Sequence, residues 1–388
     1  MSIPRHLTHV LLDRAREFPV VTLTGPRQSG KTTLCRAAFA HLPYANLEQP
    51  DTRAFAQADA RGFLAQFPGG AVIDEVQRVP DLLSWVQVQV DAHPGNGQFI
   101  LTGSHQFELM ASVTQSLAGR TALLRLLPLS INELRDAHLP STGDRLLYAG
   151  GYPRIHAQPV NPSTVLGDYF ETYVERDLRQ LIELRQLREF RRFVQLCAGR
   201  VGGLLNLHSL AADVGVSDPT ARAWMNLLEA SFVVYLLPPW FENLGKRLTK
   251  APKLYFYDVG LAAWLIGVRE PSQLAAHPLR GPLFENLVVM EFVKHFEHHG
   301  ERAPLNFYRD SHGLEADLVV QHAGRPGGIG LVEIMSGQTF HGDFAANLQR
   351  VARVLGPRVT RQMVLYGGGD AYVRDGVEVV GLHAGVSA

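Results

Sequence analysis

The chain contains few cysteines, no long apolar run and no net charge, and each shortage excludes a class of protein. Only Cys35 and Cys197 occur among 388 residues, without metal-ligand spacing, which argues against a disulfide-linked secreted protein and indicates a reduced, cytoplasmic one. The longest apolar run, residues 232–237, is far too short to span a bilayer, and the first residues carry no apolar signal core. Basic and acidic residues number 37 each, so any contact with nucleic acid must come from a local basic patch.

Length and hydrophobic patterning indicate a globular protein of several domains. With 388 residues, of which 46% are hydrophobic, the chain is too long for one ordinary core. Between residues 20 and 129, short apolar runs alternate with helical stretches, as they do in βαβ units. The predicted strands are residues 20–24, 71–74, 99–102 and 122–127. We therefore expect an α/β fold with a parallel sheet in this part of the chain.

A phosphate-binding sequence follows the first predicted strand. Residues 25–32 match the pattern G-x-x-x-x-G-K-[ST] at every fixed position and precede a helical pattern. Two glycines let the backbone wrap around a polyphosphate, whose charge then meets N–H groups and a helix N-terminus. Lys31 would reach the β- and γ-phosphates, and Thr32 would ligate Mg²⁺. The residues expected to bind ATP are Gly25, Pro26, Arg27, Gln28, Ser29, Gly30, Lys31, Thr32 and Thr33.

Two carboxylates end the next long predicted strand. Asp74 and Glu75 directly follow the apolar residues 71–73. In P-loop NTPases an aspartate at this position holds Mg²⁺ through water, and an adjoining glutamate deprotonates the attacking water. We therefore predict that Asp74 serves the metal and that Glu75 is the catalytic base. The alternative is a pair of solvated charges that merely ends a buried strand.

Three further side chains are candidates for contact with the γ-phosphate. Thr102 and Ser104 follow the third predicted strand, and either hydroxyl could sense the phosphate, although both also suit a turn beside Gly103. Arg120 precedes the last strand and could stabilise charge in the transition state, unless it is a structural arginine. Arg27, inside the loop, could contact phosphate or a neighbouring subunit.

Several stretches together resemble the bacterial and archaeal AAA+-type ATPases that combine an AAA_14 domain with a DUF4143 region. The matching residues are 23–34, 73–77, 101–104, 117–120, 128–130, 150–153, 173–177 and 258–261. The resemblance implies a P-loop NTPase (AAA+-like) parallel sheet with a helical lid, followed by a winged helix and a PD-(D/E)xK-like α/β module. The corresponding ranges are residues 1–150, 151–202, 203–275 and 276–388.

A helix-turn-helix pattern lies in the third of these ranges. Residues 207–228 place small apolar side chains in two helices, with a turn at residues 215–217 and Ser217 as the cap of the second helix. A basic segment follows and could hold phosphate on a wing. The expected DNA-binding residues are Thr220, Arg222, Asn226, Lys246, Arg247, Lys250 and Lys253. Winged helices also serve as protein-packing modules, and this alternative stays open.

The last range holds a degenerate nuclease constellation. Glu285, Asp317 and Glu333 resemble the carboxylates of the PD-(D/E)xK arrangement, in which a lysine two residues after the second acid stabilises charge. Met335 stands at that position, and methionine carries no charge. Lys294 and Arg309 are other cations of this region, but their spacing gives no reason to expect a substitute. We therefore predict a nuclease-like fold used for binding or assembly, with little or no cleavage.

The leading hypothesis is a Mg²⁺-dependent ATPase whose nucleotide cycle drives binding or remodelling of duplex or branched DNA, in repair, recombination or defence. Arg27 and Arg120 suggest ATP at a subunit boundary and hence a homo-oligomer such as a ring. The alternative is a signalling ATPase that switches binding to a protein partner, without a DNA substrate. No membrane partner is expected.

Overall fold

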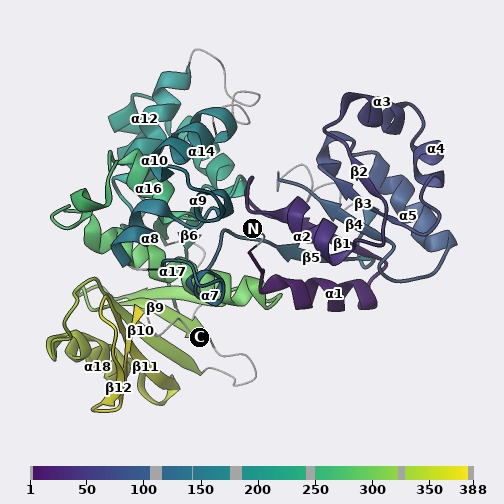
Figure 1. Cartoon of the computed structure of the whole chain (residues 1–388). Helices are drawn as coiled ribbons and strands as arrows, with labels where there is room; N and C mark the ends of the chain where they lie inside the picture. Colours follow the sequence, from purple (N-terminus) through teal and green to yellow (C-terminus); the bar gives the residue numbers. More distant parts are fainter. Residues whose placement is uncertain are drawn as a thin grey trace. The chain divides into compact units, whose positions relative to one another are not determined.

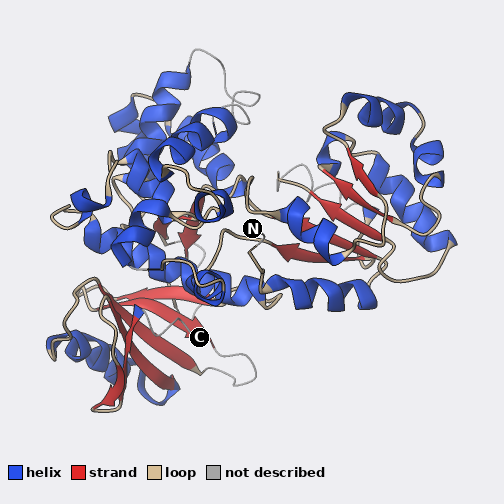
Figure 2. Cartoon of the chain, in the orientation of Figure 1, coloured by secondary structure: helices blue, strands red, loops and turns tan. Residues whose placement is uncertain are grey.

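The computed structural model describes residues 3–104, 116–141, 143–174, 186–241, 250–321 and 328–382 (Figure 1). The chain divides into two compact units. The first comprises residues up to 129 together with 230–232 and 296–301, and the second comprises the rest. Both units combine helices with a β-sheet, as the colours of Figure 2 show. The finer division of the second unit into three domains stays a prediction.

The first unit is built on a five-stranded parallel sheet. Its strand order is β2-β3-β4-β1-β5, and every pairing is parallel. The strands are β1 Val20–Thr24, β2 Tyr44–Asn46, β3 Ala71–Asp74, β4 Phe99–Thr102 and β5 Thr121–Arg125. Because all strands run the same way, their carboxyl ends meet at one edge, where ligands bind in open α/β sheets.

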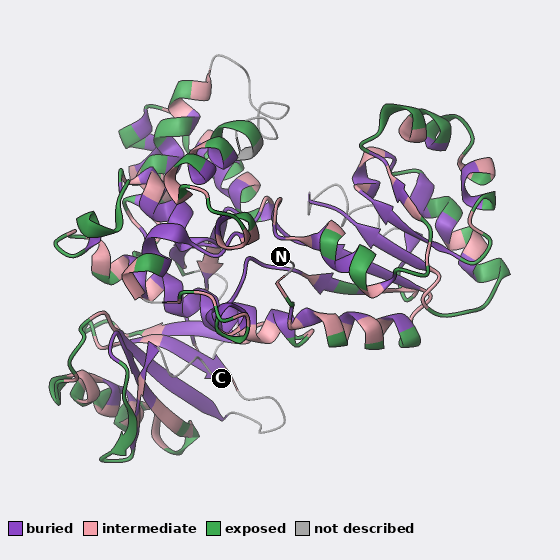
Figure 3. Cartoon of the chain, viewed as in Figure 1, coloured by how far each residue is buried: buried purple, intermediate pink, exposed green. Residues whose placement is uncertain are grey.

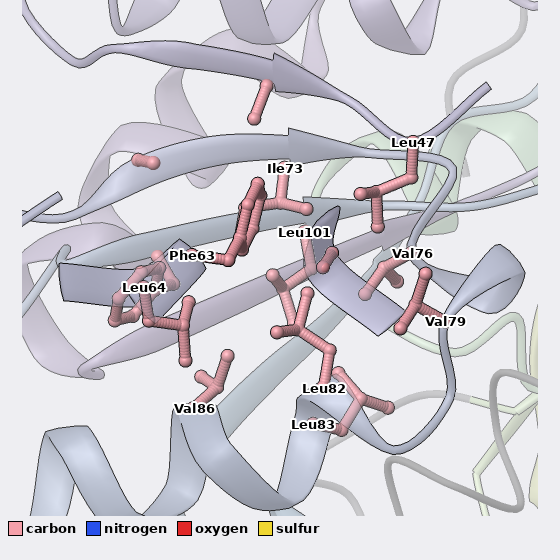
Figure 4. Close-up of a cluster of buried hydrophobic side chains, with 14 of the residues drawn as sticks. Leu47, Phe63, Leu64, Ile73, Val76, Val79, Leu82, Leu83, Val86 and Leu101 are labelled. Carbon is pink, nitrogen blue, oxygen red and sulfur yellow. The ribbon is translucent and has the colours of Figure 1, made fainter. Parts of the chain in front are cut away.

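Helices cover both faces of this sheet because successive strand residues point to opposite sides. Val21 and Ile100 face a cluster that includes α1 Leu7–Glu17 and α2 Lys31–Ala38. Their neighbours Val20 and Phe99 face the other cluster, which is drawn in Figure 4. The helices on that side are α3 Pro50–Ala58, α4 Ala60–Ala65 and α5 Leu82–Ala92. Figure 3 shows the central strands β1, β3 and β4 buried and the outer helix surfaces largely exposed. Each large apolar side chain buried in this way stabilises the unit by roughly 1.5–3 kcal/mol.

Three predicted strands of the first unit coincide with β1, β3 and β4. The last one is shifted, since β5 begins at Thr121 and ends at Arg125. Strand β2 was not predicted, because three residues are too few to show an alternating pattern. Parallel pairing with β3, which only the folded chain provides, places β2 in the sheet.

The second unit has helices before and after the helix-turn-helix segment. Those before the helix-turn-helix segment are α7 Ile131–Asp136, α8 Gly143–Ala149, α9 Pro153–Ala157, α10 Pro162–Tyr169, η2 Phe170–Val174 and α12 Leu187–Ala198. Those after it are α16 Val259–Leu265, η4 Pro271–Leu274 and α17 Arg280–His298. The stretch expected to be helical from residue 164 to 198 therefore contains α10, η2 and α12, and residues 175–185 lie outside the described part.

The predicted helix-turn-helix elements are present. Helix α13 Leu207–Val214 ends at Gly215, which has a left-handed φ of 86°, and α14 Asp218–Ala230 follows. The Thr220 N–H donates to Ser217 Oγ at 3.3 Å, which confirms Ser217 as the cap of α14. Strands β6 Val234–Leu237 and β7 Lys253–Phe256 then pair antiparallel.

A six-stranded sheet completes the second unit. Its order is β12-β13-β11-β10-β9-β8. The elements are β8 Leu305–Arg309, β9 Glu315–Gln321, β10 Ile329–Met335, α18 Asp343–Leu355, η5 Gly356–Arg358, β11 Val359–Tyr366, β12 Ala371–Arg374 and β13 Val377–Gly381. Strands β8, β9 and β10 form an antiparallel meander, whereas β10, β11 and β13 are parallel. Leu348 and Val351 of α18 pack in one cluster with residues of β9, β10 and β11.

Two segments that contribute to the family resemblance meet inside the second unit. The Gly151 N–H donates to Asp258 Oδ2 at 2.7 Å, and Asp258 Oδ1 also accepts the Leu261 N–H, at 2.9 Å, as the cap of α16. A Cβ on Gly260 would lie 2.5 Å from the Gly150 nitrogen, so only glycine fits there. Residues 150–151 and 258–261 therefore form one buried joint.

Within the described residues, every helix falls short of the length and apolar composition that a membrane crossing requires.

Candidate nucleotide site

The phosphate-binding loop joins β1 to α2 at the carboxyl edge of the parallel sheet. Gly25 has a φ of 139°, and a Cβ there would lie 2.2 Å from the Leu126 oxygen. Gly30, with a φ of 95°, is the residue before α2. Both positions therefore require glycine, one for close approach and both for the left-handed side of φ space. Helix α2 begins at Lys31, which directs its free N–H groups toward the loop.

The Lys31 side chain reaches back across the loop to its first two residues. Its ammonium donates to the Gly25 oxygen at 3.0 Å and to the Pro26 oxygen at 2.8 Å, and the residue is 6% exposed. Burial lowers the pKa of Lys31 to about 8, partly offset by the charges of Glu75 and Asp74.

Two polar atoms of the loop have no hydrogen-bond partner among the described residues. They are Gln28 Oε1 and Ser29 Oγ, and both are buried. Buried polar atoms are rarely left unpaired unless a ligand or water completes them. Together with the two glycines and the Lys31 ammonium, they make the loop fit a phosphate ligand.

Arg5, which the sequence did not single out, also forms hydrogen bonds that fix the loop. Its guanidinium donates to the Ser29 oxygen at 2.6 Å and to the Leu127 oxygen at 2.6 Å. Arg5 is 8% exposed, so these charge-assisted bonds are shielded from water. Arg5 therefore ties the loop to the segment that follows β5. Nothing in the local sequence around Arg5 signals this, because both acceptors are backbone oxygens far along the chain.

Asp74, at the end of β3, accepts hydrogen bonds from three hydroxyl groups. Its Oδ2 accepts from Thr32 Oγ1 at 2.8 Å and from the Tyr44 hydroxyl at 2.7 Å. Its Oδ1 accepts from Thr102 Oγ1. The structure thus brings the two residues expected at the metal, Thr32 and Asp74, into contact. Tyr44 is an addition that sequence reasoning missed, and burial together with the Asp74 bond raises the pKa of its hydroxyl.

Glu75 has a backbone conformation that few residues adopt. Its φ of 58° lies in the left-handed region, just beyond β3. Its Oε2 accepts from Gln77 Nε2 and, at 3.2 Å, from Ser104 Oγ. The two hydroxyls that the sequence could not distinguish therefore have different partners, Ser104 contacting Glu75 and Thr102 contacting Asp74. Which of them senses the γ-phosphate stays a prediction.

Arg120 lies away from the loop of its own chain. Its backbone oxygen accepts the Val20 N–H at 3.2 Å, at the amino ends of β1 and β5, whereas the phosphate loop follows the carboxyl end of β1. Its guanidinium pairs with Asp91, at 2.6 and 2.8 Å. Within its own chain Arg120 forms an ion pair at the sheet edge opposite the loop, and its expected action on the γ-phosphate stays a prediction. Arg27 is half-buried in the loop.

The lowered pKa of Lys31 predicts that ATP binding takes up protons. Above pH 8 the nucleotide-free lysine is mostly neutral, whereas polyphosphate favours the ammonium. We expect the association constant for ATP to fall by up to about tenfold per pH unit between pH 8 and 10. Calorimetry near pH 8.5, in buffers of different ionisation enthalpy, measures this uptake. Lys31→Arg, whose side chain stays charged, should bind without it. Equal proton uptake in both proteins would rule out this origin of the pH dependence.

The expected DNA-binding residues divide into three groups. Arg222, Asn226 and Lys250 are exposed and Thr220 is half-buried, so these four remain candidates. Lys246 and Arg247 lie outside the described residues. Lys253 is 4% exposed, and its ammonium contacts carboxylates, so its expected place on a basic surface is wrong.

The carboxylates of the second unit lie on three elements. Glu285 belongs to α17, Asp317 to β9 and Glu333 to β10. Burial and the Glu285 charge raise the pKa of Asp317 to about 7, and burial with the Asp317 charge raises the pKa of Glu333 to about 8. Met335 is the last residue of β10. Lys253, which the sequence placed elsewhere, lies beside this cluster, with Nζ 2.9 Å from Glu285 Oε1 and 3.6 Å from Asp317 Oδ1.

Comparisons with known proteins agree with this site. The "AAA domain" model AAA_14 matches residues 17–135, "Domain of unknown function (DUF8612)" matches 142–272, and "Domain of unknown function (DUF4143)" matches 280–384. The chain is 34% identical over 332 residues to the uncharacterized proteins Rv2008c of Mycobacterium tuberculosis and Mb2031c of Mycobacterium bovis. Each alignment covers 84% of this chain and 74% of the relative.

The solved structures that align with this chain have lower sequence identity to it. The Walker-type ATPase PABY2304 of Pyrococcus abyssi aligns with a TM-score of 0.41 and 16% identity over 67% of this chain and 94% of its own. RuvB of Thermotoga maritima aligns with a TM-score of 0.31 and 19% identity over 63% and 92%. Likeness at this level carries no functional argument. The family is shown instead by the sequence identity over most of both chains, by the AAA_14 and DUF4143 models and by the phosphate-binding loop: the chain belongs to the AAA_14 and DUF4143 family of AAA-type P-loop ATPases.

Proposed function

We propose that this chain hydrolyses ATP with Mg²⁺ and couples the nucleotide cycle to binding or remodelling of DNA. The observation that carries the first half is the convergence of Lys31, Thr32 and Asp74 at one sheet edge, with Thr32 Oγ1 2.8 Å from Asp74 Oδ2. Glu75 follows Asp74 directly. These are the residue types that phosphoryl transfer from a nucleotide requires.

Each residue has a role that its contacts support. The loop N–H groups and Lys31 bind the phosphates, and Thr32 and Asp74 are the residues that would hold Mg²⁺, which neutralises phosphate charge when bound. Glu75 accepts the proton of the attacking water. In the described arrangement its Oε2 accepts from Gln77 and Ser104, and these two bonds would orient the carboxylate toward the attacking water.

DNA coupling is supported by the second unit. Helix α14, the second of the helix-turn-helix pair, exposes Arg222 and Asn226, and Lys250 is exposed shortly before β7. The order α12, α13, α14, β6, β7 is that of a winged helix, in which the second helix of the pair reads the major groove and the wing contacts phosphate. Contacts of this kind weaken with salt.

The position of Arg120 supports assembly with further copies of the chain. Because its own phosphate loop lies at the opposite sheet edge, Arg120 would act only on nucleotide bound to a neighbour. We propose a homo-oligomer, such as a ring, located in the cytoplasm.

The test is steady-state ATP hydrolysis without DNA and with single-stranded, duplex or four-way-junction DNA, at two salt concentrations and with Glu75→Gln as blank. We expect stimulation by one DNA form that fades at higher salt. The variant Arg222→Ala with Lys250→Ala should lose the stimulation. Arg350→Ala, on an exposed part of α18, is the matched control that keeps it.

The alternative is a nucleotide-switched protein-interaction ATPase. Turnover that is unchanged with every DNA would favour it, because the helix-turn-helix would then be only a packing element. A protein that co-purifies with Glu75→Gln in ATP, but not with Lys31→Ala, would identify the partner.

A further inference from the structure

The six-stranded sheet of the second unit has two edges, and only one of them is covered among the described residues. At the β8 edge, the Phe307 N–H donates to the Pro238 oxygen at 3.1 Å, and the Trp240 N–H donates to the Phe307 oxygen at 2.6 Å. At the other edge lies β12, whose outer side pairs with no described strand (Figure 1). All four residues of β12 are exposed. An uncovered edge strand is a template for pairing with another chain.

A tight hairpin holds β12 against β13. Its two-residue turn consists of Asp375 and Gly376, whose φ angles of 51° and 76° are both positive, as a type I′ turn requires. The turn places Arg374 directly opposite Val377, where the pairing of the two strands begins. Turns of this type match the natural twist of the strands they join. Strand β12 is therefore already extended before anything binds to its outer edge.

The register decides which backbone groups of β12 are free. In an antiparallel pair, residues that bond to the partner strand alternate with residues whose N–H and C=O groups point away from it. The Gly381 N–H donates to the Asp370 oxygen at 2.7 Å, so the even-numbered residues 370, 372 and 374 bond toward β13. The N–H and C=O groups of Ala371 and Val373 therefore point to the uncovered edge. The side chain of Val373 belongs to a residue that is 70% exposed.

These free groups fit the same strand of a second copy in one antiparallel register. When Ala371 lies opposite Val373 of the second copy, a two-fold axis relates the copies, and both residues of each strand form their hydrogen bonds. Tyr372 then lies on the axis, opposite its own counterpart. One step further out, Asp370 lies opposite Arg374 of the second copy, and the symmetry repeats this pair. The register that satisfies the backbone thus also brings opposite charges together twice.

Charge complementarity favours a second copy as the occupant of this edge. Asp370 and Arg374 are both exposed. Within the chain, Arg374 Nε lies 3.8 Å from Asp375 Oδ2, and both side chains of this pair are largely exposed, so it holds Arg374 weakly. Side chains of directly opposed residues that do not exchange hydrogen bonds lie closest together, and opposite charges there stabilise a strand pair, whereas like charges destabilise it.

We propose that β12 pairs with β12 of a second copy and joins the two six-stranded sheets into one continuous sheet. The Tyr372 ring, whose centroid lies 6.0 Å from that of Phe340 in its own chain, adds an aromatic contact at the axis. This contact is separate from the assembly through the nucleotide site proposed above, and it needs no ATP. One strand pair buries less surface than a standard interface, so the dimer is weak and requires protein at about 100 µM to be well populated.

Two charge reversals test the register. Asp370→Arg leaves like charges opposite each other at both ends of the paired strands, and Arg374→Asp does the same with the other sign. Each variant alone should dimerise at least about tenfold more weakly than the wild type. Mixed together, the two variants should associate about as tightly as the wild type, because each strand then meets opposite charges on the other. Pairing in another register, or with an unrelated peptide, does not predict this recovery.

Val373→Pro tests the backbone hydrogen bonds. The Val373 N–H points away from β13, so proline removes no bond within the sheet and is tolerated on an edge strand of this kind. It removes a donor that the second copy needs, twice in each dimer. We expect dimerisation to weaken by at least about tenfold, with little change in the melting temperature.

The experiment is sedimentation velocity of the full chain without nucleotide, at roughly 1–100 µM protein. Arg61→Asp, a reversal at an exposed arginine of α4, is the matched control and should dimerise like the wild type. Weaker dimers in both single reversals, with recovery in their mixture, support the proposal. A wild-type chain that stays monomeric at about 100 µM, or a mixture no tighter than either variant alone, overturns it. A folded Val373→Pro that dimerises like the wild type also overturns it, and the reversals, which change only exposed side chains, decide independently of this variant.

Discussion

Glu75→Gln is expected to lower kcat for ATP hydrolysis by roughly 10²–10⁴-fold while nucleotide affinity stays nearly unchanged. The substitution keeps the size of the side chain and removes only its ability to accept a proton. Gln77 and Ser104, which contact Glu75 Oε2, can still bond to the amide oxygen, so the local structure should persist. Loss in kcat with retained binding is the signature of an interaction made in the transition state.

Single-turnover hydrolysis and equilibrium binding of ATP measure the two quantities separately. Glu48→Gln is the matched control, because Glu48 is an exposed glutamate of the same unit that pairs with Arg78. Lys31→Ala should show the opposite pattern, with weakened nucleotide binding, because it removes the ammonium from the loop. Wild-type turnover in Glu75→Gln would show that another group is the base.

Asp258→Ala is expected to lower the free energy of unfolding of the second unit by roughly 2–5 kcal/mol. The carboxylate is 3% exposed and accepts the N–H groups of Gly151 and Leu261. Alanine would leave these donors buried without a partner, at about 1–3 kcal/mol each. The joint between residues 150–151 and 258–261 would then loosen, since the cap of α16 would be lost.

Urea unfolding followed by tryptophan fluorescence measures this effect, because Trp264 lies on α16 itself. Asp144→Ala is the control, since Asp144 forms a more exposed ion pair with Arg280 and should change stability by less than about 1 kcal/mol. Gly260→Ala should also destabilise, because its Cβ would meet the Gly150 backbone. Asp258→Ala and Asp144→Ala of equal stability would contradict the role of the joint.

The nucleotide site could be predicted well because its parts are local in sequence. A phosphate-binding loop is one contiguous segment whose glycines and lysine have set positions, and β1, β3 and β4 show continuous apolar runs as buried parallel strands do. The helix-turn-helix was predictable for the same reason, because its caps and apolar positions recur within a few residues. Short elements such as β2 and edge strands such as β12 carry too little pattern.

The sequence by itself determined the family, the loop that fits phosphate and the placement of Asp74 and Glu75 side by side after a strand. Each of these depends on residues that are neighbours in the chain. Only the tertiary structure decided the rest. Arg5 under the loop and Tyr44 on Asp74 depend on groups brought together by folding. The same holds for Arg120, which lies at the far edge of the sheet, and for Lys253, which lies among distant carboxylates. The sequence gives the charge type of each side chain. The charges that surround that side chain depend on packing, and they determine what it can bind.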